Sequence, residues 1–150
     1  IRSFNRDTRQ AYRLEAEALV QQIDRAANAL KARQKAGIKK EKKAFLQDLY
    51  QKLRLQQAKL FVLIWRLGGY KEDRHPDVVY RDKALDILNR DELADLKEAK
   101  ALKISIYSNI LDRWHWFEGQ QVIEGIKRNR KSMVKELKVL QKELKNAETS

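Results

Sequence analysis

The sequence predicts an all-α protein, built as an antiparallel four-helix bundle or as long helical hairpins with one short extra helix. Its 150 residues include only five glycines and one proline, and helix formers such as Leu, Lys, Ala and Glu dominate. Apolar residues recur three and four positions apart along most of the chain, as on one helical face. Turn signals are too few for an all-β fold, and the length suits one helical domain over residues 1–150.

The first helix is predicted over residues 7–36. Asn5 or Asp7 offers an N-terminal cap, and Gly37 supplies a C-terminal stop. The apolar stripe that would face the core consists of Tyr12, Ala16, Leu19, Ile23, Ala26 and Leu30.

The second helix is predicted over residues 38–67, and Gly68 and Gly69 would end it. The stripe widens towards its end, which favours contact with more than one neighbouring helix. Residues 70–78 contain Pro76 and are predicted to form a loop before a short helix over 79–88. The stripe consists of Phe45, Leu49, Leu53, Leu60, Leu63 and Leu67, widened by Val62, Ile64 and Trp65.

Helical periodicity continues over residues 91–117 and 120–147, but the two apolar phases do not join around Gly119. Two alternatives follow. Either the helix breaks near Gly119 and doubles back, or one long helix continues through a stutter. A break would give four helices of similar length, as an up-down bundle requires.

The net charge of +12 is concentrated in two short segments. Residues 31–43 contain seven basic residues and one acidic residue, and residues 127–145 contain eight basic and two acidic residues. Each segment therefore carries +6, and the rest of the chain is neutral. Within the second segment, lysines step by three or four positions, which predicts a lysine row on one helical face. This row consists of Lys127, Lys131, Lys135, Lys138, Lys142 and Lys145.

Such a row favours a polyanionic partner, because like charges four positions apart repel each other in a helix. We therefore expect the protein to bind the phosphate backbone of DNA or RNA without reading the base sequence. The predicted contacts are Lys39, Lys40, Lys42, Lys43, Lys127, Arg128, Arg130, Lys131 and Lys135. Alternatively, the lysines are solvated or pair with acids of a neighbouring helix, such as Asp91, Glu92, Asp95 and Glu98.

An aromatic cluster supports a second hypothesis, in which the protein is a helical scaffold that docks other proteins or copies of itself. The cluster either plugs the core where helices meet or forms a docking surface for a partner. The residues concerned are Trp65, Trp114, Trp116 and Phe117. A third hypothesis is peripheral binding to an anionic membrane surface through the basic helix over 120–147.

Enzymatic chemistry is not expected. The chain has no cysteine and two histidines, and no nucleotide-binding or nucleophile motif occurs. His75 follows Glu72 by three residues but lies in the predicted loop without a second copy of the motif, so no metal site is predicted. No cofactor is predicted either.

Cellular context is only loosely constrained. No apolar run reaches the ~18 residues that a membrane span needs. The absence of cysteine fits an intracellular, reducing compartment. No signal peptide is recognised at the start. Because the chain begins with Ile1 rather than Met, we expect a processed product or a trimmed fragment.

Overall fold

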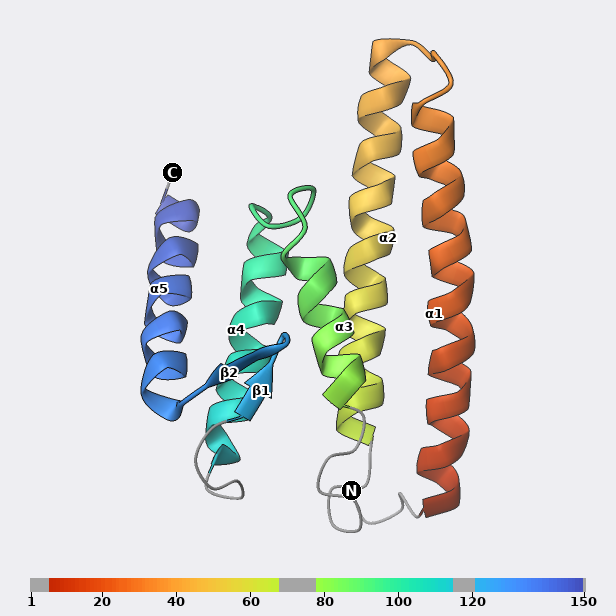
Figure 1. The fold of residues 1–150 in the computed structure, drawn as a ribbon. Coiled ribbons are helices and arrows are strands. Elements are labelled where there is room, and N and C mark those ends of the chain that lie inside the picture. The colour runs from red at the N-terminus through yellow and green to blue at the C-terminus, as the bar shows by residue number, and fades with distance from the viewer. Residues whose placement is uncertain (1–5, 68–77, 115–120, 150) are drawn as a thin grey trace. The chain divides into compact units, whose positions relative to one another are not determined.

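The computed structural model describes residues 6–67, 78–114 and 121–149, and it confirms the all-α class (Figure 1). The chain divides into two compact units, Ile1–Ile87 and Leu88–Ser150. The prediction of a single helical domain stays a prediction. None of the described helices is both long and apolar enough to cross a membrane.

The first unit is built on a long helical hairpin. Helix α1 (Arg6–Gln34) packs against α2 (Lys40–Leu67), and Gly37 with φ of 71° forms the left-handed stop between them. The helix bounds lie within two residues of those predicted. On α1, the small residues Ala16 and Ala27 are buried, which allows the two helices to approach closely.

The predicted core stripes of these two helices are partly wrong. On α1, Tyr12 and Leu19 are about half exposed, and Val20 is buried instead. On α2, Phe45 and Leu63 are exposed, and the buried residues are Tyr50, Leu55, Ala58, Phe61, Val62, Ile64 and Trp65. The interface between the helices also contains two polar residues of α2, and hydrophobic periodicity gives no weight to polar positions.

These two polar residues are Arg54 and Gln57. Arg54 is only 5% exposed, and its guanidinium donates to the Asp24 carboxylate and to the Asn28 side-chain oxygen. Gln57 accepts a hydrogen bond from Arg54 and donates to the backbone oxygen of Val20. The cluster is fully hydrogen-bonded across the hairpin, as buried polar groups require.

Helix α3 (Val78–Leu88) follows and confirms the short extra helix. Its buried side chains include Ala84, Leu85 and Ile87. Tyr80 stacks on Phe61 of α2 and donates a hydrogen bond to Glu17 of α1. These contacts tie α3 to the helical hairpin within the first unit.

The second unit contains α4 (Lys97–Asp112), a small hairpin of β1 (Gln121–Ile123) and β2 (Ile126–Arg128), and α5 (Arg130–Thr149). Helices α4 and α5 pack against each other. The core of this unit is apolar apart from Tyr107. It consists of Leu88, Leu93, Ala99, Ile106, Tyr107, Ile110, Trp114, Ile123 and Met133.

The β-hairpin corrects the sequence prediction for this region. One continuous helix is excluded, because α4 ends at Asp112 and antiparallel strands pair Val122 with Lys127. Gly119 itself lies outside the described residues. Residues 91–95 form a turn rather than the start of a helix. Strands replace the predicted first turns of helix 120–147 because Glu124 and Gly125 both have positive φ, which is the geometry of a type I′ turn.

Helix α5 begins at Arg130 because Asn129 caps it. The side-chain oxygen of Asn129 accepts a hydrogen bond from the backbone N–H of Ser132 at 2.8 Å. The hydroxyl of Ser132 donates in return to the backbone oxygen of Asn129 at 2.9 Å. An asparagine in this position satisfies an N–H group that the helix leaves unpaired.

Candidate nucleic-acid interface

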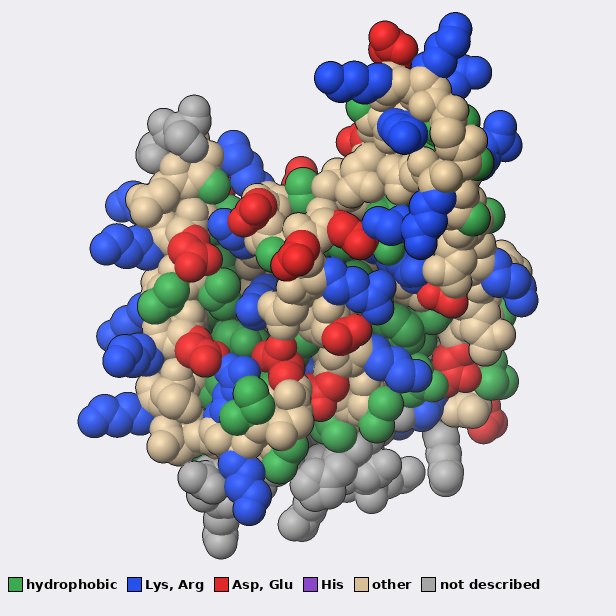
Figure 2. Space-filling view, turned by 45° about the horizontal axis from the view of Figure 1, so that its top comes forward, with side chains coloured by type: hydrophobic (Ala, Val, Ile, Leu, Met, Phe, Trp, Pro, Cys, Tyr) green, Lys and Arg blue, Asp and Glu red, His purple; other side chains and the backbone are tan. Residues whose placement is uncertain are grey.

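The first basic segment surrounds the turn between α1 and α2, and we call its exposed part the hairpin-end surface. It consists of Lys39, Lys40, Lys42 and Lys43. Figure 2 shows basic side chains gathered at this end of the helical hairpin. None of the four ammonium groups forms an ion pair with a described carboxylate.

Local electrostatics make the hairpin-end surface more positive than its lysines alone. Lys40, Lys42 and Lys43 lie in the first turns of α2, where the helix dipole already contributes positive charge. Glu41 is the single acidic residue in the first turn. Cations at a helix N-terminus are unfavourable, so a bound anion would relieve repulsion there.

Phe45 lies one turn after these lysines and is 63% exposed. The sequence prediction had placed it in the core stripe of α2. Position 45 lies three residues after Lys42, so the two side chains share one face of the helix. An exposed aromatic ring beside cations is a surface on which an unpaired base can stack.

The second basic segment lies on α5, and we call its lysines the α5 row. It consists of Lys131, Lys135, Lys138, Lys142 and Lys145, all exposed and spanning ~21 Å of helix. Figure 2 shows basic side chains projecting along α5. No described carboxylate lies within ion-pair distance of any of the five, including the acids at 91–98.

The remaining predicted contacts of this segment lie outside the row. Lys127 is exposed, but it belongs to β2, so the prediction that it continues the helical row is wrong. Arg130 is exposed at the first position of α5. Arg128 differs from both, because its side chain is 13% exposed and pairs with Glu124 and Glu136. Its charge is already neutralised within the second unit.

The tryptophans of the predicted docking cluster are divided between the two units. Trp65 is 9% exposed and Trp114 is 6% exposed, so both indoles are interior groups. Trp116 and Phe117 lie outside the described residues, as do His75 and His115. Within the described ranges, no group of three His, Asp or Glu side chains is arranged to hold a metal ion.

Sequence reasoning identified the two basic segments but missed two features near them. Exposure of Phe45 was missed because hydrophobic periodicity placed it in the core stripe, whereas the buried part of α2 includes the polar residues Arg54 and Gln57. The turn at Glu124–Gly125 had a weak signal, a glycine between the β-branched pair Val122–Ile123 and Ile126.

In comparisons with known proteins, the chain matches no protein-family model, no curated protein and no solved structure.

Proposed function

We propose that the protein is a non-enzymatic binder of nucleic-acid backbone that does not depend on base sequence. The observation that carries this proposal is the set of exposed lysines on the hairpin-end surface and the α5 row, none of which pairs with a described carboxylate. Lysine serves as a point charge that contacts a phosphate from many directions, which suits binding to backbone rather than to base edges.

Repulsion among these lysines adds to the driving force for binding. In the α5 row, each lysine has a like charge three or four residues away, and pairs at this spacing destabilise a helix. Binding to phosphates removes the repulsion and releases the counterions condensed on the nucleic acid. Each surface lies within one unit, so each can bind on its own.

Exposure of Phe45 favours single-stranded over duplex nucleic acid at the hairpin-end surface. Stacking needs an unpaired base with a free face, and a stacked base on an aromatic ring contributes affinity regardless of its identity. The lysines would then hold the backbone while Phe45 contacts one base.

The test is equilibrium binding of fluorescent single strands and duplexes of unrelated sequence across a salt series. If the four or five lysines of one surface contact phosphates, log Kd against log salt should have a slope of about 3.5 to 4.5 in magnitude for duplex DNA. Affinity should be similar for unrelated sequences. A slope near zero, or strong preference for one sequence, would refute the proposal.

Two variants show which surface binds, because each replaces the lysines of one surface by uncharged glutamine. They are K39Q/K40Q/K42Q/K43Q and K131Q/K135Q/K138Q/K142Q/K145Q. The matched control is R25Q/K52Q/K59Q/K97Q, which removes four exposed cations outside both surfaces. We expect at least one surface variant to weaken binding more than tenfold and the control to weaken it far less. Equal losses for all three would show that only net charge matters. Binding to anionic vesicles without binding to oligonucleotides would favour a membrane surface instead.

A second candidate function, a helical assembly module, is favoured by one observation on α1. Tyr12 and Leu19 lie seven residues apart on one face and are each about half exposed, which is the spacing of a coiled-coil contact. Light scattering over a range of protein concentrations tests this candidate. A monomer at all concentrations would exclude self-association.

A further inference from the structure

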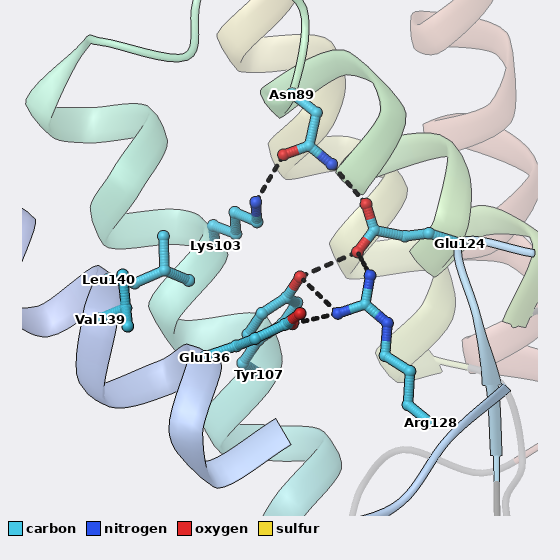
Figure 3. A pocket seen from close by; sticks show the side chains of 8 residues that line it. All are labelled: Asn89, Lys103, Tyr107, Glu124, Arg128, Glu136, Val139 and Leu140. Carbon is cyan, nitrogen blue, oxygen red and sulfur yellow. Dashed lines mark hydrogen bonds and ion pairs between the residues drawn. The ribbon is translucent and has the colours of Figure 1, made fainter. Parts of the chain in front are cut away.

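The second unit contains a pocket of about 350 Å³ that the proposed function does not use (Figure 3). Its lining comes from four segments, namely the turn after α3, α4, the β-hairpin and α5. The lining residues are Asn89, Lys103, Tyr107, Glu124, Arg128, Glu136, Val139 and Leu140. At the ~30 Å³ that a water molecule occupies in the liquid, this volume accommodates roughly a dozen non-hydrogen atoms.

Most of the polar groups in the pocket bind one another. Glu124 accepts hydrogen bonds from Tyr107 Oη at 2.8 Å and from Asn89, and it pairs with Arg128. Arg128 also pairs with Glu136, so two carboxylates surround one guanidinium. Figure 3 shows these side chains converging on Glu124 and Arg128. The polar groups in this part of the pocket are therefore partners of one another.

Glu124 occupies a backbone conformation that favours glycine, asparagine or aspartate. Its φ is 57°, and among the residues that the structure describes it is the only non-glycine residue with a positive φ. Glutamate is a poor choice for the turn alone, so its carboxylate accounts for its presence there. Strained residues of this kind are concentrated at sites that bind or react.

Lys103 is the cation of the pocket without a carboxylate partner among the described residues. Its Nζ donates to Asn89 Oδ1 at 2.6 Å and lies 5.6 Å from the centre of the Tyr107 ring. An ammonium group has three donors, so two remain for a ligand. A carboxylate is the ligand group that would accept both and neutralise the charge.

Val139 and Leu140 of α5 form the apolar side of the pocket. Val139 is 51% exposed, so part of this apolar side chain is in contact with water. Figure 3 shows these two side chains on the far side of Lys103 from Glu124. A ligand whose carboxylate meets Lys103 would therefore place a short apolar tail against α5.

We propose that this pocket binds a small carboxylate with a short apolar tail. Two sources share this chemistry, namely a free aliphatic acid and the C-terminal carboxylate of a peptide that ends in an apolar residue. The proposal is independent of nucleic-acid binding, because Lys103 belongs to neither basic surface.

The test is titration of the full chain with sodium hexanoate, followed by two-dimensional NMR of the amide groups, with hexanol as the uncharged control. Hexanoate should shift signals of residues 89, 103, 124 and 139–140 with a Kd of about 1 mM, as expected for a ligand of this size. Hexanol should bind at least tenfold more weakly. Equal binding of both compounds, or shifts only at the basic surfaces, would overturn the proposal.

Two variants refine the assignment. Lys103→Gln should weaken hexanoate binding about tenfold, whereas Lys97→Gln, an exposed lysine on the same helix, should leave it unchanged. Unaltered binding in K103Q would also overturn the proposal, and a thermal melt shows whether that variant is folded. N-acetylleucine separates the two sources, because tighter binding of N-acetylleucine than of hexanoate identifies the peptide terminus. The amide of N-acetylleucine is the uncharged control. Oligonucleotide affinity of K103Q should stay at the level of the unmodified protein.

Discussion

Arg54 of α2 and Asp24 of α1 form an ion pair of 2.6 Å between Nη1 and Oδ1, and the two partners differ sharply in exposure. The side chain of Arg54 is 6% exposed, whereas that of Asp24 is 49% exposed. The guanidinium is therefore a buried cation, and its carboxylate partner lies at the surface of the helical hairpin. This asymmetry predicts that the two partners respond differently to substitution.

Asp24→Ala should destabilise the protein more than Arg54→Met. Loss of Asp24 leaves a buried guanidinium without its counter-ion, which costs ~2–3 kcal/mol after allowing for the solvent exposure of Asp24. Arg54→Met removes the buried charge, although it also removes the donor to the Gln57 side-chain oxygen, and should cost ~1 kcal/mol less. Urea unfolding followed by circular dichroism measures both. The reverse order would show that the pair contributes mainly through packing of the arginine.

Glu124 combines an unfavourable backbone conformation with favourable side-chain contacts, so the stability of variants at position 124 should depend on which of the two is changed. Glu124→Gly relieves the positive φ but loses the carboxylate, whereas Glu124→Ala keeps the strain and loses the carboxylate as well. The alanine variant should therefore be less stable than the glycine variant by ~1 kcal/mol. Chemical unfolding of the two variants checks this difference. Equal stability would mean that the turn relaxes when the carboxylate is removed.

Tyr107 should make stability depend on alkaline pH. Burial raises the pKa of its phenol above the ordinary value, and the negative charge of Glu124 raises the pKa further. The folded state therefore keeps the phenol proton at pH values where the unfolded chain loses it. Stability that this group contributes should be complete below about pH 10 and decline as the pH rises further.

The measurement is the difference in unfolding free energy between the unmodified protein and Tyr107→Phe from pH 8 to 11. The difference cancels the titration of other tyrosines and lysines. It should shift in favour of Y107F above about pH 10. A difference that does not change with pH would show that the phenol titrates alike in the folded and unfolded states.

The Asn129 cap should set the stability of α5. Asn129→Ala removes the acceptor for the Ser132 N–H and should cost ~1 kcal/mol, whereas Asn129→Asp keeps an acceptor at the same place. Thermal unfolding of both variants is the measurement. The prediction fails if alanine and aspartate at position 129 have the same melting temperature.

Phe45 should contribute to single-strand affinity if it stacks on a base. Phe45→Ala should lower affinity for an unstructured oligonucleotide by ~1–3 kcal/mol, whereas Phe45→Trp should preserve it. Leu14→Ala, at another exposed apolar position on α1, serves as the matched control. Full affinity in F45A together with a retained salt dependence would remove stacking and leave the backbone-binding proposal intact.

Local composition determined α1, α2 and α3 and the two basic segments. Runs of helix formers bounded by Gly37 and by the 68–77 segment predicted α1 and α2 within two residues. Charge can be read residue by residue, so the positions of the basic segments along the chain follow directly from the sequence. The lysine row on α5 was also visible in the sequence, because lysines spaced three and four residues apart lie on one face of a helix.

The hairpin at residues 121–128 was missed because its strands have three residues each, too short for an alternating pattern to be distinguished from helical spacing. The sequence signal for its turn was weak, and the positive φ of Glu124 and Gly125 established the turn. The pocket was missed because it depends on residues from four separate segments whose proximity no local pattern encodes.

The sequence by itself determined the all-α class, the bounds of α1 to α3 and where the positive charge lies along the chain, because propensity and charge belong to individual residues and their near neighbours. Only the tertiary structure decided which cations are free. Arg128 and the lysines of the α5 row come from one basic segment, yet Arg128 is neutralised by Glu124 and Glu136 while the row faces solvent. The physical reason is that an ion pair depends on a distance across the fold, and that distance exists only once the chain has folded.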